Sequence, residues 1–189
     1  MTGREDPFVE TALAAAEEVL GEPLHVQRGA ALLYQVKVNT RLEITVNPKR
    51  PMRGESAFQT DLCVFERIDV ETDIPRVVLE FKQRVTTHDI LIYSTKARKH
   101  KQIYPYLRYG LVIGEEVKVP GKFFTHNEAL DFCVAAASFK RNRLHEIFAK
   151  LLKAEVQASR HLERLTSGQV IAHYFRNDIA FDEGPGKVV

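Results

Sequence analysis

Two carboxylates and one lysine between residues 61 and 82 have the types and the spacing that metal-assisted hydrolysis needs. In the apolar run 76–82, strand alternation places Glu80 and Lys82 on the same face. A carboxylate and an ammonium among apolar neighbours need partners, because an unpaired buried charge is costly. If residues 57–65 and 76–82 pair as antiparallel strands across a ten-residue loop, Asp61 lies directly opposite Glu80.

This pairing predicts a metal site. Two carboxylates placed opposite each other repel unless a positive charge lies between them. Mg²⁺ takes hard oxygen ligands and keeps positions open for water and phosphate. Such an ion lowers the pKa of a bound water and polarises a phosphodiester, while Lys82 would orient that water and offset charge on the phosphorus. We therefore expect hydrolysis of a nucleic-acid backbone; the alternative is a surface hairpin whose Glu80 and Lys82 are solvated.

The flanking sequence predicts the elements that must position these residues. Hydrophobic periodicity, caps and turn residues indicate helices at 8–20, 87–104 (begun by Thr86 or Thr87), 127–137 (capped by Asn127) and 139–165. Alternating or apolar runs indicate strands at 32–38, 41–46, 57–65, 76–82 and 109–113, with turns at Asn39-Thr40 and Pro120-Gly121 and an exposed polar loop at 66–75.

The last long helix has two interpretations. Its apolar residues follow a near-heptad spacing through Leu144, Phe148, Leu151, Ala158 and Leu162, which suits either packing on its own domain or pairing in a homodimer. We accordingly divide the chain into an α/β core at 1–138, a C-terminal helical extension at 139–181 and a flexible tail at 182–189.

Positive charge is concentrated in the segment that follows the candidate catalytic residues Asp61, Glu80 and Lys82. Residues 82–108 hold seven Lys/Arg and one acid, which is the footprint expected for phosphate backbones. The expected nucleic-acid contacts are Arg84, Lys96, Arg98, Lys99, Lys101 and Gln102. The interleaved Tyr104, Tyr106 and Tyr109 would stack on bases or pack beneath the helix, and a solvated helix face is the alternative. A basic loop with Lys49, Arg50 and Arg53 would contact nucleic acid or stand free.

Asp61, followed after eighteen residues by Glu80-Phe81-Lys82, resembles the core of the PD-(D/E)xK nuclease superfamily, with Thr60 in place of the motif's proline. The resemblance covers roughly residues 8–115. It implies an α/β restriction-endonuclease-like fold, a mixed sheet flanked by helices.

The resemblance also implies residue roles. Asp61, Glu80 and the main-chain carbonyl of Phe81 would bind Mg²⁺ or Mn²⁺, and Lys82 would be the catalytic lysine. The implied substrate is DNA, cut as an endonuclease, although the residues themselves indicate only a polyanion and leave RNA open. In related nucleases the first helix sometimes adds a carboxylate, here Glu10, Glu17 or Glu18. Gln102 and Tyr106 have a Q-x-x-x-Y spacing seen in one branch of the superfamily, with Pro105 between them.

Composition excludes some classes of protein. The 189 residues carry 27 Lys and Arg against 25 Asp and Glu, a net charge of +2. There is no apolar run of about 18 residues and no secretory signal. Two separated cysteines favour free thiols in a reducing compartment, so we expect a cytoplasmic protein. Besides the nuclease, two hypotheses stay open: a non-catalytic nucleic-acid-binding module on the same scaffold, and an interaction protein that uses the C-terminal helix.

Overall fold

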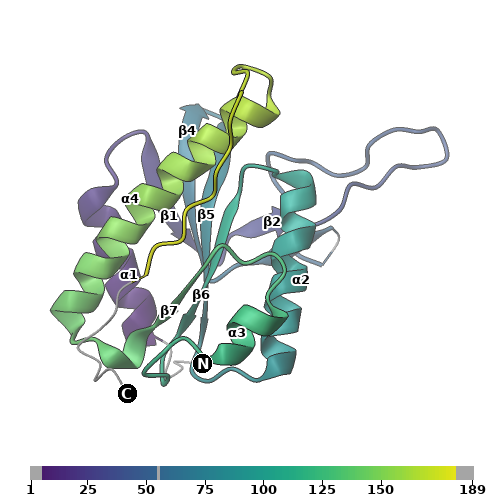
Figure 1. The fold of residues 1–189 in the computed structure, drawn as a ribbon. Coiled ribbons are helices and arrows are strands. Elements are labelled where there is room, and N and C mark those ends of the chain that lie inside the picture. The colour runs from purple at the N-terminus through teal and green to yellow at the C-terminus, as the bar shows by residue number, and fades with distance from the viewer. Residues whose placement is uncertain (1–5, 55, 182–189) are drawn as a thin grey trace.

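The computed structural model describes residues 6–54 and 56–181 and contains a five-stranded mixed sheet (Figure 1). Its strands, in spatial order, are β1 (Leu24–Arg28), β4 (Leu62–Asp69), β5 (Thr72–Lys82), β6 (Arg108–Ile113) and β7 (Phe132–Ala135). The first three pair antiparallel, and β5, β6 and β7 pair parallel. The expected mixed α/β sheet with flanking helices and a long C-terminal helix is confirmed.

Helices cover both faces of the sheet (Figure 1). One core packs α1 (Asp6–Val19) and α4 (Arg141–Thr166) against Leu79 and Phe81 of β5, and the other packs α2 (Thr87–Ile103) and α3 (Gly121–His126) against Val78. Because side chains alternate along a strand, Glu80 lies on the side of α2, with Val78.

The start of α2 follows its sequence signals. The Thr86 side chain accepts from the Asp89 N–H at 3.1 Å, and the Asp89 carboxylate accepts from the Thr86 N–H at 2.8 Å. This capping box satisfies two main-chain donors at the helix start. The helix ends at Ile103, before Pro105, because proline lacks the N–H that would continue it.

The long helix α4 packs on its own domain. Phe148, Leu152 and Val156, each four residues apart, are buried against α1 and the sheet. The near-heptad seam expected through Leu151 and Ala158 is only half-buried. Packing on the core is thus confirmed, whereas a homodimer through this helix stays a prediction. The tail at 182–189 lies outside the described residues.

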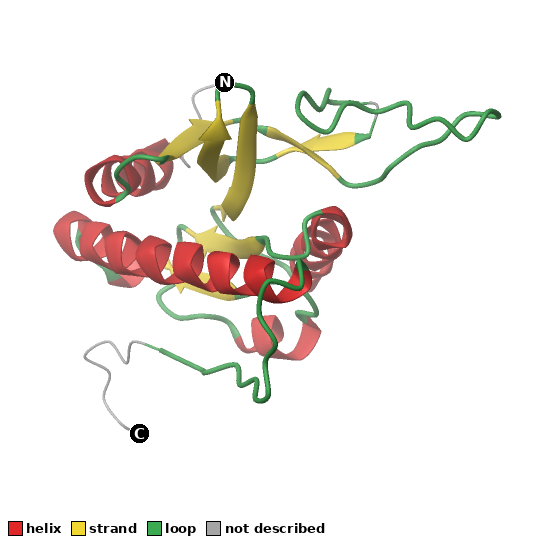
Figure 2. Ribbon diagram, turned by 90° about the horizontal axis from the view of Figure 1, so that it is seen from above, coloured by secondary structure: helices red, strands yellow, loops and turns green. Residues whose placement is uncertain are grey.

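Residues 32–46 depart from the two expected strands. Only β2 (Ala31–Leu33) is a strand there, paired with β3 (Ala57–Gln59) in a separate ribbon. Residues 35–53, which we call the arm, extend away from the sheet (Figure 2). Within the arm a single bridge joins Val38 to Ile44. The expected turn at Asn39-Thr40 is present and runs from Asn39 to Leu42, whose N–H donates to the Asn39 carbonyl at 3.0 Å and whose φ is 62°. The alternating residues of the arm do not form a strand, because apolar side chains such as Val36, Val38 and Ile44 are exposed and have no surface to pack on.

Two further expectations were wrong for local reasons. The strand 57–65 breaks at Thr60, whose N–H and hydroxyl both donate to the Ala30 carbonyl, at 2.8 and 3.0 Å. The polar stretch 66–75 is strand on both sides of a tight turn, because its charges pair across the hairpin, as Arg76 does with Glu66 at 2.7 Å.

The expected helix 127–137 is instead β7 followed by a short 3₁₀ helix, η1 (Ala136–Ser138). Asn127 ends α3, and its side-chain oxygen accepts from the Leu130 N–H at 2.7 Å. Asn127 therefore lies at the end of a helix and not at the start of one, and its side chain holds the loop that leads to β7. Strand β1, which holds His25, is not among the strands expected from the sequence. Among the described helices, none has the length and apolar character needed to cross a membrane.

Replacing Phe148 by alanine should lower the free energy of unfolding by about 3–5 kcal/mol, because its fully buried ring joins α4 to the sheet and α1. Urea denaturation measures the change. Lys153→Ala, on the exposed side of the same helix, should change it by about 0.5 kcal/mol or less. Equal effects of the two substitutions would mean that α4 does not pack on this core in solution.

Candidate active site

The observed register brings Asp61 and Glu80 to the same place. Strand β4 pairs with β5 through Leu62↔Leu79 and Cys63↔Val78, so one further step sets Asp61 opposite Glu80, as expected from the sequence. Asp61 is exposed and lies just before β4. Its Oδ2 accepts from the Phe81 N–H at 2.8 Å, and its carbonyl accepts from the Gly29 N–H at 3.1 Å. The first bond joins Asp61 to β5, and the second joins it to the end of β1.

Glu80 is a buried carboxylate with two donors. It is 2% exposed, and its Oε1 accepts from Lys96 Nζ at 2.6 Å and from the Tyr109 hydroxyl at 2.5 Å. Burial raises the pKa of Glu80 to about 7; the Asp61 charge adds to the rise, and Lys96 opposes it. The alternative of a solvated Glu80 is therefore wrong.

The two lysines near Glu80 occupy different positions. Lys82 follows on the same side of β5 but is 41% exposed, and its Nζ lies 3.9 Å from Asp89 Oδ1. Lys96 Nζ instead bonds Glu80 and the Gln59 carbonyl, the latter at 2.7 Å. The ammonium in contact with the buried carboxylate thus comes from α2 and not from the strand triplet.

Sequence reasoning missed Lys96 and Tyr109 as partners of Glu80, although signals for both exist. In the parallel pairing, Tyr109 stands opposite Val78, so its side chain shares the face of Glu80. Helix α2 connects β5 to β6 and buries Ala97 against the sheet, which places the neighbouring Lys96 at the border of that buried face. Recognising these contacts needs the parallel β5–β6 register, which residue spacing alone does not reveal.

Three oxygen-bearing groups come from residues that are neighbours at this edge of the sheet. The Lys82 carbonyl faces β6, where it accepts from the Gly114 N–H at 2.8 Å. By alternation the Phe81 carbonyl faces the other way, toward Asp61, as its N–H does. The side chains of Asp61 and Glu80 with this carbonyl form the type of oxygen set that Mg²⁺ prefers.

Glu10, Glu17 and Glu18 of α1 do not join this set. Within residues 6–54 and 56–181, no group of three or more His, Cys, Asp or Glu side chains has the arrangement to hold a metal. Glu10 instead pairs with Arg28 at 2.5 Å, and Glu18 pairs with His145 at 3.2 Å. Helix α1 also packs on the sheet face opposite Glu80, so the expected extra ligand from Glu10, Glu17 or Glu18 is not placed near the site.

Most cations of the stretch 82–108 are paired with acids from later in the chain. The pairs are Arg84–Glu115 at 2.5 Å, Arg98–Glu128 at 4.0 Å, Lys101–Asp131 at 2.7 Å, Arg108–Asp131 at 2.9 Å and Arg108–Glu155 at 2.6 Å. The local excess of positive charge is therefore largely neutralised. Lys101, which also bonds the Ala129 carbonyl, is held by the fold; contact of nucleic acid with Arg84 or Arg98 stays a prediction.

The tyrosines after α2 serve packing. The Tyr104 hydroxyl accepts from the Leu33 N–H at 3.3 Å, Tyr109 is buried, and the Tyr106 ring lies 5.4 Å from the Arg76 guanidinium carbon. Because α2 ends at Ile103, Gln102 and Tyr106 do not share a helical face, although Gln102 itself is exposed.

His100 joins α2 to the β2–β3 ribbon. Its Nδ1 lies 2.9 Å from the Leu33 carbonyl, which can only accept, so Nδ1 carries the proton. The other ring nitrogen is buried without a partner. Burial lowers the pKa of His100 to about 4, so the imidazole is neutral at neutral pH.

No family model matches this chain, and no curated protein matches it. We therefore infer its function from the residues and contacts described above.

Above pH 7, where Glu80 is ionised, Lys96→Met should lower the free energy of unfolding by about 3–5 kcal/mol, because it leaves a buried carboxylate without its cation. Urea denaturation of a double-mutant cycle with Glu80→Gln should show that the combined loss is smaller than the sum of the single losses. Lys82→Met is the matched control, since its exposed ammonium makes only a long contact. Equal losses in both lysine variants would refute the Lys96–Glu80 bond.

Acidification should destabilise the protein through His100. Its folded pKa is about 4 and the ordinary value is 6.5, so between these values the unfolded state binds more protons and the free energy of unfolding falls as pH falls. His100→Asn should reduce the loss between pH 7 and pH 4.5 by about 2–3 kcal/mol. Denaturation at both pH values tests this, with exposed His126→Asn as the control. An identical loss in wild type and His100→Asn would contradict it.

Proposed function

We propose that this chain is a metal-dependent nuclease of the PD-(D/E)xK type that hydrolyses phosphodiester bonds of DNA. The observation that carries the proposal is the pairing of Asp61 with the buried Glu80 across two adjacent strands, with Lys82 on the same side. The Phe81 carbonyl supplies a third oxygen at that edge. A buried carboxylate facing a second carboxylate is unfavourable for stability alone, which supports a functional reason for keeping both.

Each residue has a role in this proposal. Asp61, Glu80 and the Phe81 carbonyl would hold Mg²⁺ or Mn²⁺, and a bound ion would polarise the phosphodiester and lower the pKa of a water. Lys96 favours the ionised form of Glu80, and Tyr109 donates to the same oxygen and so holds the carboxylate in one orientation. Lys82 is half-exposed and makes only a long contact with an acid, since its Nζ lies 3.9 Å from Asp89 Oδ1. It would orient the attacking water and offset charge on the phosphate.

A second candidate is a non-catalytic nucleic-acid-binding module. It is favoured by Lys96, whose ammonium already neutralises Glu80 at 2.6 Å. If that bond persists when nucleic acid binds, the carboxylate needs no metal. For either function we place the protein in a reducing compartment such as the cytoplasm, because Cys63 and Cys133 are both free thiols.

The nuclease should cut DNA only with Mg²⁺ or Mn²⁺, and Glu80→Gln or Asp61→Asn should lower the rate about a hundredfold or more, since each removes a ligand of the ion that stabilises the transition state. Supercoiled, linear and single-stranded DNA, each with metal or chelator, are the substrates; nicking of circles identifies an endonuclease. Glu71→Gln, an exposed carboxylate at the β4–β5 turn, is the control and should keep full activity.

Two results would overturn the nuclease proposal. Cutting that survives in Glu80→Gln would come from a contaminating enzyme or another site. DNA retention that is salt-sensitive, equal in wild type and Glu80→Gln, and never accompanied by cutting would establish the binding module instead.

A further inference from the structure

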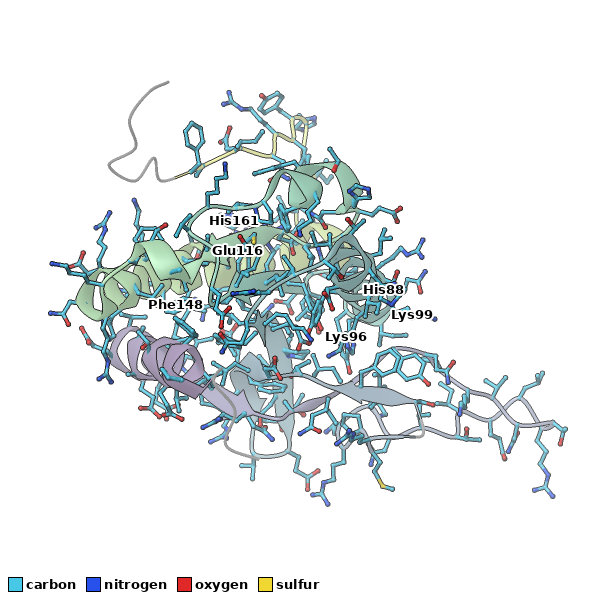
Figure 3. The ribbon with its side chains drawn as sticks, turned by 90° about the horizontal axis from the view of Figure 1, so that it is seen from below. His88, Lys96, Lys99, Glu116, Phe148 and His161 are labelled. Atoms are coloured by element: carbon cyan, nitrogen blue, oxygen red, sulfur yellow. The ribbon has the colours of Figure 1, made fainter. Side chains whose placement is uncertain are left out.

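A groove of about 710 Å³ lies between α2 and the β2–β3 ribbon. Figure 3 shows His88, Lys96 and Lys99 on the side of α2 that faces the ribbon. Phe58 in the middle of β3 and Tyr34, which directly follows β2, lie on the opposite wall. The groove was not anticipated from the sequence, because the ribbon that forms one wall was expected to be part of longer strands.

The walls of the groove are aromatic and apolar. The rings of Tyr34 and Phe58 stack with centroids 3.9 Å apart and planes inclined by 13°. Phe58 is 37% exposed, and across the groove Leu91 and Ile92 are 42% and 49% exposed. Flat rings and exposed aliphatic side chains at this density offer a surface on which a planar apolar group can stack.

The charged side chains that line the groove, among the residues the structure describes, have one sign. They are Arg53, Lys96 and Lys99, with His88 beside them, and no described Asp or Glu lines the groove. Arg53 bonds the neutral Gln59 side chain at 2.7 Å, and Lys99 lies 5.7 Å from the Tyr34 ring centroid. These two cations therefore differ from Arg84, Arg98 and Lys101, whose charges are paired with acids.

Lys96 connects the groove to the carboxylates. Lys96 lines the groove and also bonds Glu80, and Gln59, whose carbonyl accepts from the same ammonium, is two residues before Asp61. A chain lying along the aromatic wall would thus pass beside Lys96 and approach the exposed Asp61.

We propose that this groove binds a segment of single-stranded nucleic acid, with bases stacked on the Tyr34–Phe58 wall and phosphates held by Lys99 and Arg53. The inference rests on the proposed function and deepens it by naming the substrate class. A single strand is the occupant that uses both features, because its bases expose their faces while its backbone carries the negative charge. In a duplex those faces are stacked on one another and hidden from the aromatic wall.

Fluorescence anisotropy with a labelled oligodeoxythymidylate, its RNA counterpart and a duplex of equal length tests the proposal in chelator, where no cutting occurs. Either single strand should bind at least about tenfold tighter than the duplex. Phe58→Leu and Lys99→Gln should each weaken single-strand binding about tenfold, and Lys99→Gln should also reduce the dependence on salt. Lys153→Gln, an exposed lysine on α4, is the matched control.

Equal binding of single strand and duplex, or groove variants that bind like Lys153→Gln, would overturn the inference. Circular dichroism shows whether each variant is folded. If Phe58→Leu is not folded, the binding measured for Lys99→Gln, at a half-buried lysine, tests the proposal by itself. Failure of the nuclease proposal gives a different result. The groove variants would still weaken single-strand binding, but no metal-dependent cutting would appear. Metal-dependent cutting that is lost in Glu80→Gln but unaffected by the groove variants would support the nuclease proposal and overturn the proposal that the groove binds a single strand.

Discussion

The need to neutralise one buried carboxylate organises the centre of this fold. Glu80 lies in the middle strand of the sheet, and its Oε1 receives bonds from Lys96 of α2 and Tyr109 of β6. Asp61, directly before the other neighbouring strand, β4, accepts from the N–H of Phe81, the residue that follows Glu80. The start of β4, the helix α2 and the strand β6 are therefore all joined to β5 by polar contacts with the adjacent residues Glu80 and Phe81. Such contacts are directional, so they constrain the placement of α2 more narrowly than apolar packing would.

A second buried charge lies nearer the start of the same strand. Arg76 is 2% exposed and bonds Glu66 of β4 and Glu163 of α4, each at 2.7 Å. Arg160 of α4 bonds Glu66 as well, at 2.8 Å. Strand β5 is thus attached to the helix on each of its faces by an ion pair, to α4 through Arg76 and to α2 through Glu80. Apolar residues of β5 between them, Val77 to Leu79, complete the two cores.

Residue patterns predicted what depends on local rules. The hairpin register that pairs Asp61 with Glu80, the capping box of α2 and the long α4 all follow from alternation, caps and spacing within one or two elements. The residue patterns did not predict the structure where the interacting residues are distant in the sequence or absent. Residues 36–44 alternate but have no surface to cover, and the polar stretch 66–75 forms strand because its charges pair across the hairpin. The basic stretch 82–108 looked like an open patch, yet acids at 115, 128, 131 and 155 neutralise most of it.

The order of elements around the candidate site has a consequence for folding kinetics. Asp61, Glu80, Lys96 and Tyr109 lie on a hairpin followed directly by a strand–helix–strand unit, β4–β5 and then β5–α2–β6. Contacts among them join segments that are close in the chain, so the loops that must close before they form are short and cost little entropy. The arm at 35–53 lies outside this stretch. Insertions or deletions in the arm therefore lengthen no loop whose closure assembles the carboxylates, and the arm's length is free to vary without slowing that step.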